Sequence, residues 1–234
     1  ALYLLAFFRK RVVLPVYVIS LMPLLIYAHN GIELFVLYLV SGVITMYVFQ
    51  YFNMGWRQFV TALIVFGSVL VTFIGFRLIN DGSSFTEYKL TLFLFLGSML
   101  SVAGYPLIFL MEKIFGLVSN TRLQDLADPN NKLLRILAQK APGTFQHSLQ
   151  VMNLSDAAAR SIDANVLLVR AGAMYHDIGK TENPQCFVEN EGVGAKYHDG
   201  LTPLESAKMI INHVTDGMRL AEKYNLPTII SDFI

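Results

Sequence analysis

Charged side chains are scarce in this sequence: Asp, Glu, Lys and Arg make up 15% of its 234 residues, whereas apolar residues make up 54%. The mean hydropathy is accordingly high, at +0.50. A single ordinary soluble domain needs more polar surface than this composition supplies. Part of the chain is therefore expected to face lipid.

Cysteine is nearly absent as well, since Cys186 is the only one. One cysteine excludes a disulfide within the chain and is compatible with a reducing compartment. No signal peptide is visible. No alternating apolar and polar run is long enough to require a β-sheet, so the predicted fold class is all-α.

The charges that are present divide the chain into two parts. Residues 1–115 hold seven Lys or Arg and four Asp or Glu, whereas residues 116–234 hold eleven and thirteen. The second part therefore has the composition of a soluble domain with a small negative charge. A partner made of duplex DNA or RNA requires a basic face, which this balance does not provide.

Apolar runs in the first part are long enough to span a membrane. Four complete spans are predicted, at Val12–Ala28, Leu34–Gln50, Phe59–Ile79 and Leu92–Met111, with a partial helix before them at Ala1–Phe8. Ionisable residues inside a membrane usually mark a transport path, and these runs contain almost none. We interpret the bundle as an anchor in the lipid bilayer and a signal relay.

Basic residues in the short loops set the expected orientation. Arg9, Lys10, Arg11 and Arg57 lie in loops that alternate with the loop before Glu33, and basic loops stay on the cytoplasmic side. The chain is therefore expected to be a multi-pass protein of the cell (inner) membrane with its second part in the cytoplasm. The predicted division is a membrane bundle at 1–111, a juxtamembrane connector at 112–128 and a cytoplasmic helical domain at 129–234.

Proline, glycine and capping residues mark the helices of the second part. Asp128 and Pro129 predict a helix over Asn130–Lys140, which Ala141-Pro142-Gly143 should end. Thr144 is expected to cap the next helix, Phe145–Ile162. The helix that follows, about Asn165–Asp177, is apolar on nearly all sides and belongs at a domain centre. Thr202 and Glu205 form a capping box for a helix that begins at Pro203.

Residues that suit metal binding lie on three of these helices: His147, His176 with Asp177, and His213. His147 shares its predicted face with Val151, Leu154 and Ala158, and His213 shares one with Ile210 and Gly217, so both are expected to point inward. Imidazole and carboxylate suit Mn, Fe or Zn. Each residue also has a simpler explanation, because a histidine can bond a carbonyl and Asp177 can pair with Lys180.

Several motifs together resemble the HD-domain phosphohydrolases. They are Ala141-Pro142-Gly143-Thr144, His147-Ser148, His176-Asp177-Ile178-Gly179-Lys180-Thr181, Phe187-Val188-Glu189-Asn190, His198-Asp199 and Leu201-Thr202-Pro203. From about Thr121 onward the chain is most similar to the cytoplasmic domain of the seven-transmembrane HD receptor family. These are bacterial membrane proteins whose best-known activity is the hydrolysis of cyclic di-AMP. The resemblance implies a helical HD domain after the membrane bundle.

The resemblance also implies a set of site residues. His147, His176 and Asp177 would bind one divalent Mn or Fe ion, and Asp177 would bridge to a second ion that His213 also holds. Asp177 and Lys180 would act in catalysis, and Lys180, Phe187 and Asn190 would contact substrate. For these three the alternatives are a solvated lysine, a phenylalanine of the core and an asparagine that caps a turn.

Two departures from the family concern completeness and substrate. Family members supply a later His-His pair and an Asp, so this chain is expected to be a fragment lacking both ends, with its HD domain truncated and its dinuclear centre incomplete. Ala195-Lys196-Tyr197 precede His198, where the family usually has Asn-Pro, and Glu191 replaces the usual Gln. These positions lie in the loop that would touch substrate, and they put the identity of the base in question.

The function implied is that of a membrane-bound phosphodiesterase that hydrolyses a cyclic dinucleotide, most readily cyclic di-AMP, through attack by a metal-bound hydroxide. Two alternatives stay open: a signalling receptor or scaffold that binds nucleotide without turnover, and an HD-type nucleotidase. The sequence leaves open whether the protein forms a homo-oligomer.

Overall fold

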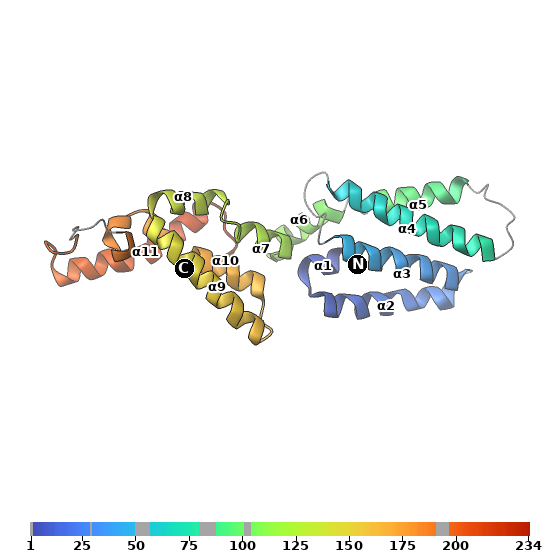
Figure 1. Ribbon diagram of the computed structural model, residues 1–234, viewed down its shortest axis with the longest axis horizontal. Helices are drawn as coiled ribbons and strands as arrows, with labels where there is room; N and C mark the ends of the chain where they lie inside the picture. The colour runs from blue at the N-terminus through green and yellow to red at the C-terminus, as the bar shows by residue number, and fades with distance from the viewer. Residues whose placement is uncertain (1, 29, 50–56, 80–87, 101–103, 191–196) are drawn as a thin grey trace. The chain divides into compact units, whose positions relative to one another are not determined.

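The computed structural model describes residues 2–28, 30–49, 57–79, 88–100, 104–190 and 197–234 (Figure 1). Within these ranges the regular elements are all helices and no strand occurs, which confirms the predicted all-α class. The chain divides into two compact units, Ala1–Ser119 and Asn120–Ile234. The boundary falls inside the segment 112–128 that the sequence assigned to a connector.

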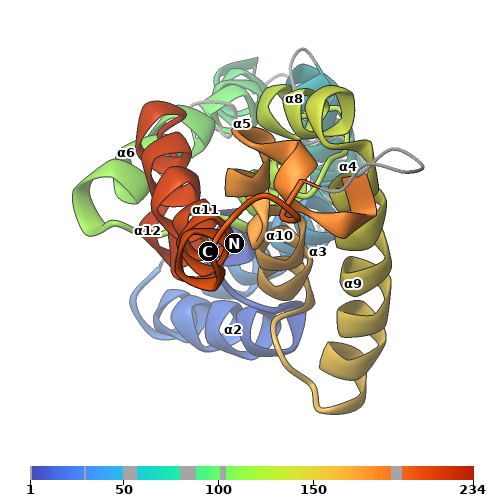
Figure 2. The ribbon, with the colours of Figure 1, turned by 90° about the vertical axis from the view of Figure 1, so that its left-hand side faces the viewer.

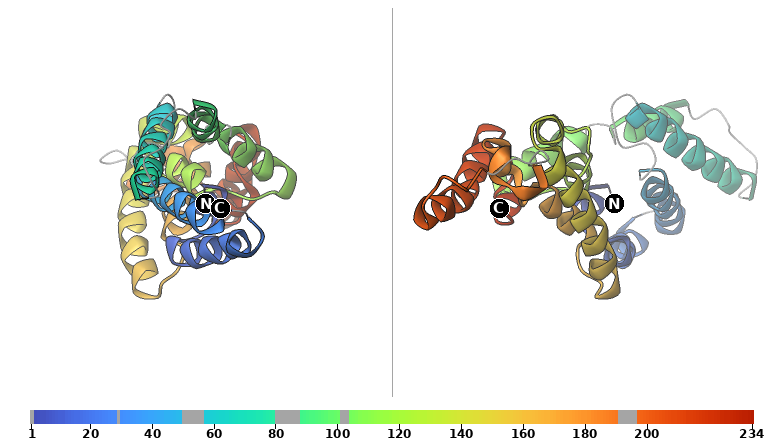
Figure 3. Two further views of the ribbon diagram at one scale, coloured as in Figure 1. Left: turned by 90° about the vertical axis from the view of Figure 1, so that its right-hand side faces the viewer. Right: turned by 60° about the vertical axis from the view of Figure 1, so that its left-hand side comes forward.

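Six helices lie in the described residues of the first unit. They are α1 (Leu2–Phe7), α2 (Lys10–Tyr27), α3 (Gly31–Val48), α4 (Arg57–Ile79), α5 (Tyr88–Leu100) and α6 (Gly104–Phe115). Helices that follow each other in the sequence pack together, α2 on α3, α3 on α4 and α4 on α5 (Figure 3). The hydroxyl of Tyr17 in α2 donates a 2.6 Å hydrogen bond to the carbonyl of Tyr38 in α3. This unit is therefore a bundle built largely from local connections.

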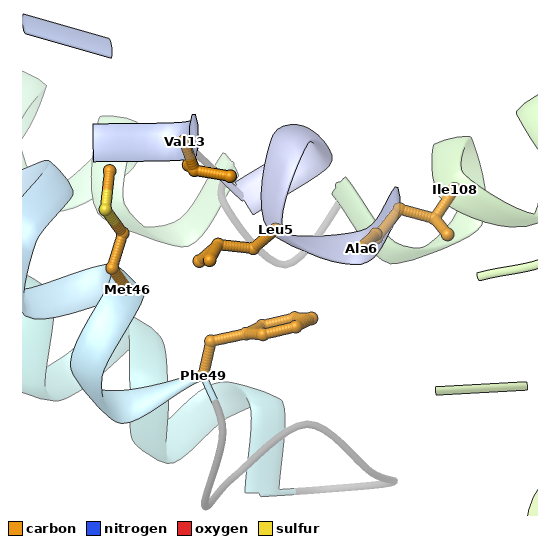
Figure 4. Packing of buried hydrophobic residues seen from close by; sticks show 6 residues of the cluster. All are labelled: Leu5, Ala6, Val13, Met46, Phe49 and Ile108. Carbon is orange, nitrogen blue, oxygen red and sulfur yellow. The ribbon is translucent and has the colours of Figure 1, made fainter. Parts of the chain in front are cut away.

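Buried apolar clusters hold the first unit together, and two of them consist of residues that the structure describes. Figure 4 shows the first, in which α1 meets α2, α3 and α6; it comprises Leu5, Ala6, Val13, Met46, Phe49 and Ile108. The second joins α3 to α4 and comprises Leu37, Val65, Val69 and Phe73. Contacts of this kind stabilise a helix bundle through close van der Waals packing. The short α1 is thus packed into the bundle through both Leu5 and Ala6.

Two helical segments, Gly31–Val48 and Phe59–Ile79, are long and apolar enough to cross a membrane, and Arg11–Tyr27 is a shorter apolar helix. They correspond to the second, third and first predicted spans, and Gln50, at the end of the second, lies outside the described residues. The fourth predicted span, Leu92–Met111, covers parts of α5 and α6, with residues 101–103 outside the described chain. Its crossing of a membrane stays a prediction.

Outside residues 191–196, which are not described, the second unit contains six α-helices and three short 3₁₀ helices. They are α7 (Asn120–Leu126), α8 (Lys132–Lys140), α9 (Pro142–Ser161), α10 (Val166–Tyr175), η1 (Ile178–Thr181), η2 (Pro184–Cys186), η3 (Val188–Asn190), α11 (Pro203–Lys223) and α12 (Thr228–Ser231). Helix α10 packs on α9, α7 and α12, and its residues Ala171 to Tyr175 are buried. Its apolar sequence predicts this central place.

Figure 2 views this unit with α9 on one side, α11 on the other and the η segments between them. The contacts agree, because η1 packs on α11 and α8, while η3 packs on α9. The 3₁₀ helices η1 and η3 therefore contact α11 and α9, which carry the candidate ligands His213 and His147.

Two predicted helix boundaries in this unit are wrong. Helix α8 begins at Lys132, two residues after Asn130, because the side chain of Asn131 caps it by accepting a hydrogen bond from the Leu133 amide. Helix α9 begins at Pro142, which the sequence interpreted as a stop. Proline is well suited to the first turn of a helix, where its missing N–H costs nothing. Thr144 consequently lies inside the first turn and is not its cap.

The predicted inward face of α9 is also wrong. Leu154 is 74% exposed, Ala158 is exposed and His147 is exposed. The buried residues of this helix are Thr144, Ser148, Met152 and Ala159. The buried stripe is therefore rotated by one residue, and it is lined largely by small and polar side chains that apolar periodicity does not detect.

Candidate metal centre

The end of α10 places His176 and Asp177 side by side. His176 still has helical backbone angles (φ −55°, ψ −32°), whereas Asp177 has left the helix (φ −112°, ψ 19°) and precedes η1. The sequence expected both residues within the helix, and Asp177 lies beyond its end. This change of conformation directs the two side chains toward each other, with His176 Nε2 3.2 Å from Asp177 Oδ2.

Gly179 brings the third element of the site close. A Cβ atom at this position would collide with the backbone of α11, at the carbonyl oxygen of His213 and the amide nitrogen of Gly217. Glycine therefore permits the close packing of η1 on α11. The packing places His213 Nε2 3.6 Å from Asp177 Oδ1.

A potential three-ligand group forms around Asp177. His147, His176 and Asp177 each offer one ligand atom, and these atoms lie within 4.8 Å of one another. The carboxylate is the buried member, at 7% exposure, while His147 is exposed. His213 approaches Asp177 from the opposite oxygen and is not part of this three-residue group. One side of the group thus stays open to solvent.

Backbone hydrogen bonds orient two of the imidazoles. Nδ1 of His176 lies 2.8 Å from the carbonyl of Ala173, and Nδ1 of His213 bonds the carbonyl of Ile210. Because a carbonyl only accepts, each Nδ1 must carry the proton, and Nε2 of the neutral ring keeps its lone pair. Metal-binding histidines are usually oriented in this way by a second hydrogen bond. Both rings present Nε2 to Asp177.

Charges around Asp177 stabilise its ionised form. Burial opposes ionisation, but hydrogen bonds from His176 and Lys180 outweigh it and hold the pKa of Asp177 well below its ordinary range. The hydrogen bond to Asp177 in turn raises the pKa of His176, against the effect of its burial. Imidazole and carboxylate are both good ligands for a divalent cation, and this donor set fits a transition metal.

Lys180 completes the polar group. Its Nζ lies 2.8 Å from Asp177 Oδ2 and 2.8 Å from Glu189 Oε1, and its side chain is 14% exposed. Burial disfavours the charge, but the bonds to Asp177 and Glu189 more than compensate and raise the pKa of Lys180. The alternative of a solvated lysine is therefore wrong.

The sequence profile of the HD domain family matches residues 144–234, a range that contains all four candidate ligands. This region is therefore similar to HD domains.

Curated relatives extend the comparison. The chain is 47% identical over 131 residues to the cyclic-di-AMP phosphodiesterase PgpH of Listeria monocytogenes serotype 1/2a (strain 10403S), which covers 56% of this chain. It is 43% identical over 138 residues, or 59% of its length, to the cyclic-di-AMP phosphodiesterase PgpH of Bacillus subtilis (strain 168). The chain spans only 18% and 19% of these two relatives.

A solved structure of the L. monocytogenes PgpH HD domain is 48% identical and matches with a TM-score of 0.43, over 44% of this chain and 50% of that one. A second structure of the same domain, in complex with cyclic di-AMP, has the same identity and TM-score and covers 45% and 49%.

Phe187 of the HD domain lies in the core rather than on an open surface. It is 7% exposed, its ring is 4.8 Å from Nζ of Lys180, and the edge-to-face contact with the His213 ring has a centroid distance of 5.7 Å. These contacts support the packing role that was the alternative to stacking on a base, and contact of Phe187 with substrate stays a prediction.

Asn190 stabilises the start of α9. Its Oδ1 accepts a 3.0 Å hydrogen bond from the Thr144 amide, and its Nδ2 donates a 2.8 Å bond to Thr144 Oγ1. The amide of a first-turn residue has no partner within its own helix. The side chain therefore acts as a cap supplied from η3, and the capping alternative accounts for it better than contact with a base.

His198 lies apart from the three-ligand group. Its Nε2 donates to the Cys186 carbonyl over 2.9 Å, and Ser206 Oγ donates to its Nδ1 over 2.9 Å. The ring thus ties η2 to α11.

The sequence predicted no role for Glu189, although this residue lies in the motif Phe187-Val188-Glu189-Asn190. Its importance depends on a contact with Lys180, nine residues earlier, and on a 3.0 Å hydrogen bond from Thr144 Oγ1, forty-five residues earlier. Neither contact follows from helical spacing. The one available signal was an acidic residue within a short motif that also contains Phe187 and Asn190.

Proposed function

We propose that this HD domain is a metal-dependent phosphodiesterase that hydrolyses a cyclic dinucleotide, most readily cyclic di-AMP. The observation that carries the proposal is the convergence of ligand atoms from His147, His176 and Asp177 within 4.8 Å, inside a region that matches the HD domain family. Identities of 47% and 43% to two PgpH cyclic-di-AMP phosphodiesterases support the choice of substrate.

The residues would divide the work as follows. His147, His176 and Asp177 hold one divalent Mn or Fe ion, and Asp177 and His213 share a second. Such ions, when bound, lower the pKa of a coordinated water and neutralise charge on a phosphodiester. Lys180 supplies a further positive charge to a phosphate oxygen from beside Asp177. Carbonyl groups of α10 and α11 keep Nδ1 protonated on His176 and His213, so that Nε2 of each ring acts as the ligand.

The first unit is proposed to anchor this domain at the bacterial cell membrane with the HD domain in the cytoplasm. Two helical segments have the length and composition of membrane spans. Large apolar side chains are exposed along the helices, among them Ile19 at 67%, Val71 at 70% and Phe93 at 68%. Soluble proteins rarely expose apolar surface to this extent, whereas lipid requires it.

The test is hydrolysis of cyclic di-AMP by the full-length protein, solubilised in detergent and loaded with Mn²⁺ or Fe²⁺, beside cyclic di-GMP and dATP. We expect metal-dependent cleavage of cyclic di-AMP that disappears in the double variant His176→Ala/Asp177→Ala. The matched control is His198→Ala/Asp199→Ala, which alters the other His-Asp pair and should leave metal loading intact.

Three outcomes would contradict the proposal. Bound metal without turnover of any of the three substrates would favour a receptor or scaffold. A preference for dATP would favour a nucleotidase. Equal loss of metal from both double variants would show that the loss is not specific to His176 and Asp177.

A further inference from the structure

The ammonium group of Lys180 is shared between two carboxylates. Its Nζ lies 2.8 Å from Oδ2 of Asp177 and 2.8 Å from Oε1 of Glu189. Asp177 is the central ligand of the candidate metal centre, whereas Glu189 lies outside the three-ligand group. The Lys180 ammonium group is thus held between Asp177, a candidate metal ligand, and Glu189, which is not in the three-ligand group.

This arrangement poses a conflict at one oxygen. Oδ2 of Asp177 accepts Lys180 and also faces His176 Nε2 at 3.2 Å. A divalent ion bound between His176 and Asp177 would compete with the ammonium group for this carboxylate. If Asp177 were the only anionic partner of Lys180, the ion pair between them would oppose metal binding to Asp177. Such a pair is strong because the site is partly buried.

Glu189 is itself fixed in place. Thr144 Oγ1 donates a 3.0 Å hydrogen bond to the same Oε1 that accepts Lys180. A Cβ atom at Gly143 would collide with the Glu189 carbonyl oxygen, so the backbone of η3 rests directly on the first turn of α9. That helix also carries His147. The second carboxylate is therefore positioned by the same element that supplies a metal ligand.

The ring of Phe187 supports the ammonium group from another side. Lys180 Nζ lies 4.8 Å from the ring centroid, within the range of a cation–π contact. Three groups thus define the position of one charge: two carboxylates and an aromatic face. Glu189 and Phe187 can therefore hold the Lys180 ammonium group even when the Asp177 carboxylate binds a metal instead of Lys180.

We propose that Glu189 is a positioning residue that anchors the Lys180 ammonium at the edge of the metal site and so keeps it from occupying Asp177. The inference rests on the metal centre of the proposed function but not on the identity of the substrate. It assigns to Glu189 a role that acts through Lys180 and not through contact with the metal or the nucleotide.

A double-mutant cycle separates this role from a general effect of negative charge. The four proteins are the wild-type 234-residue chain, Glu189→Gln, Lys180→Met and the combination, each metal-free in detergent. Binding of Mn²⁺ alone is followed through the electron paramagnetic resonance signal of the free ion. The amide of Glu189→Gln can still accept from Thr144 Oγ1, so the change removes chiefly the charge.

We expect Glu189→Gln to weaken Mn²⁺ binding about tenfold, at the lower end of the effect of outer-shell partners. In the Lys180→Met background the same change should alter the affinity by less than about twofold, because the ammonium that Glu189 restrains is gone. Glu189→Asp keeps a carboxylate and should recover part of the affinity. Thermal unfolding without metal identifies any variant that fails to fold, and Glu189→Asp then replaces Glu189→Gln in the cycle.

Each other result overturns the inference. An unchanged affinity in Glu189→Gln would show that Lys180 does not compete with the metal. An equal loss in both backgrounds would show that Glu189 acts by its charge alone. A wild-type chain that binds no Mn²⁺ would overturn the metal centre of the proposed function together with this inference, whereas a wild-type chain that binds Mn²⁺ isolates the failure to Glu189.

Discussion

His176 Nε2 and Asp177 Oδ2 lie 3.2 Å apart although the two residues are adjacent in the chain. Successive side chains on a regular helix point about 100° apart and do not meet. They meet here because His176 keeps helical backbone angles while Asp177 does not. The His-Asp pair is therefore a product of where α10 ends.

His147→Ala should abolish tight metal binding without destabilising the protein. We expect the Mn²⁺ affinity to fall by more than about 100-fold, beyond the range of outer-shell changes. Because His147 is exposed, the free energy of unfolding should change by less than about 0.5 kcal/mol. His198→Ala should do the opposite, since that ring bonds Cys186 and Ser206. Titration with Mn²⁺ and thermal unfolding of both variants test the contrast, and a loss of affinity in His198→Ala would contradict it.

The stability of the metal-free protein should depend on pH through His176. Its pKa is raised by the bond to Asp177, so the folded state binds this proton more tightly than the unfolded chain does. The resulting stabilisation is complete below the ordinary pKa of about 6.5 and is lost as the pH rises through the raised value. The melting temperature should therefore fall as the pH rises from about 6.5 through the raised pKa of His176. The fall should be smaller in His176→Gln.

Gly143→Ala should destabilise the HD domain. The added methyl group collides with the carbonyl oxygen of Glu189, and forced repacking of this kind costs about 1–3 kcal/mol. Gly200→Ala is the matched control, because a Cβ atom there meets no atom within 4 Å. Chemical denaturation of the two variants gives the comparison. Equal stability of both would mean that η3 does not rest on α9 in solution.

Asn190→Ala should lower stability and leave substrate binding unchanged. The change leaves the amide and the hydroxyl of the buried Thr144 without the two bonds that Asn190 supplies, and an unsatisfied buried group costs about 1–3 kcal/mol. Asn153→Ala, at an exposed position of α9, serves as the control. The melting temperature and the KM for cyclic di-AMP are the measurements. A raised KM with an unchanged melting temperature would instead support contact between Asn190 and a base of the substrate.

The sequence was sufficient for features that depend on neighbours in the chain. The capping box of α11 is present as predicted, with Thr202 accepting from the Glu205 amide and Glu205 accepting from the Thr202 amide. The apolar α10 lies at the centre of the second unit. Both follow from rules that act over one or two helical turns. The candidate ligands were also named from the sequence, because imidazole beside carboxylate is chemically distinctive.

Prediction was weakest where small or polar residues form a buried face. The inward stripe of α9 includes Thr144 and Ser148, each 0% exposed, so an argument from Val151 and Leu154 selected the neighbouring face. Helix α8 ends before Pro142 as predicted, but the same proline also begins α9, whose predicted start was Phe145. Composition alone does not show whether a small or polar residue is buried, or whether a proline begins a helix, because the same residue types occur in either place.

The sequence by itself thus determined the helices of the second unit, the capping box of α11 and the types of candidate ligand, because these depend on local spacing and on side-chain chemistry. Only the tertiary structure decided which atoms meet. Gly179 packed on α11 brings His213 to Asp177, and η3 packed on α9 brings Glu189 to Lys180. Such contacts join residues that lie nine to forty-six positions apart, across connections that follow no fixed period. Close packing of the folded chain sets these distances, and no local rule contains them.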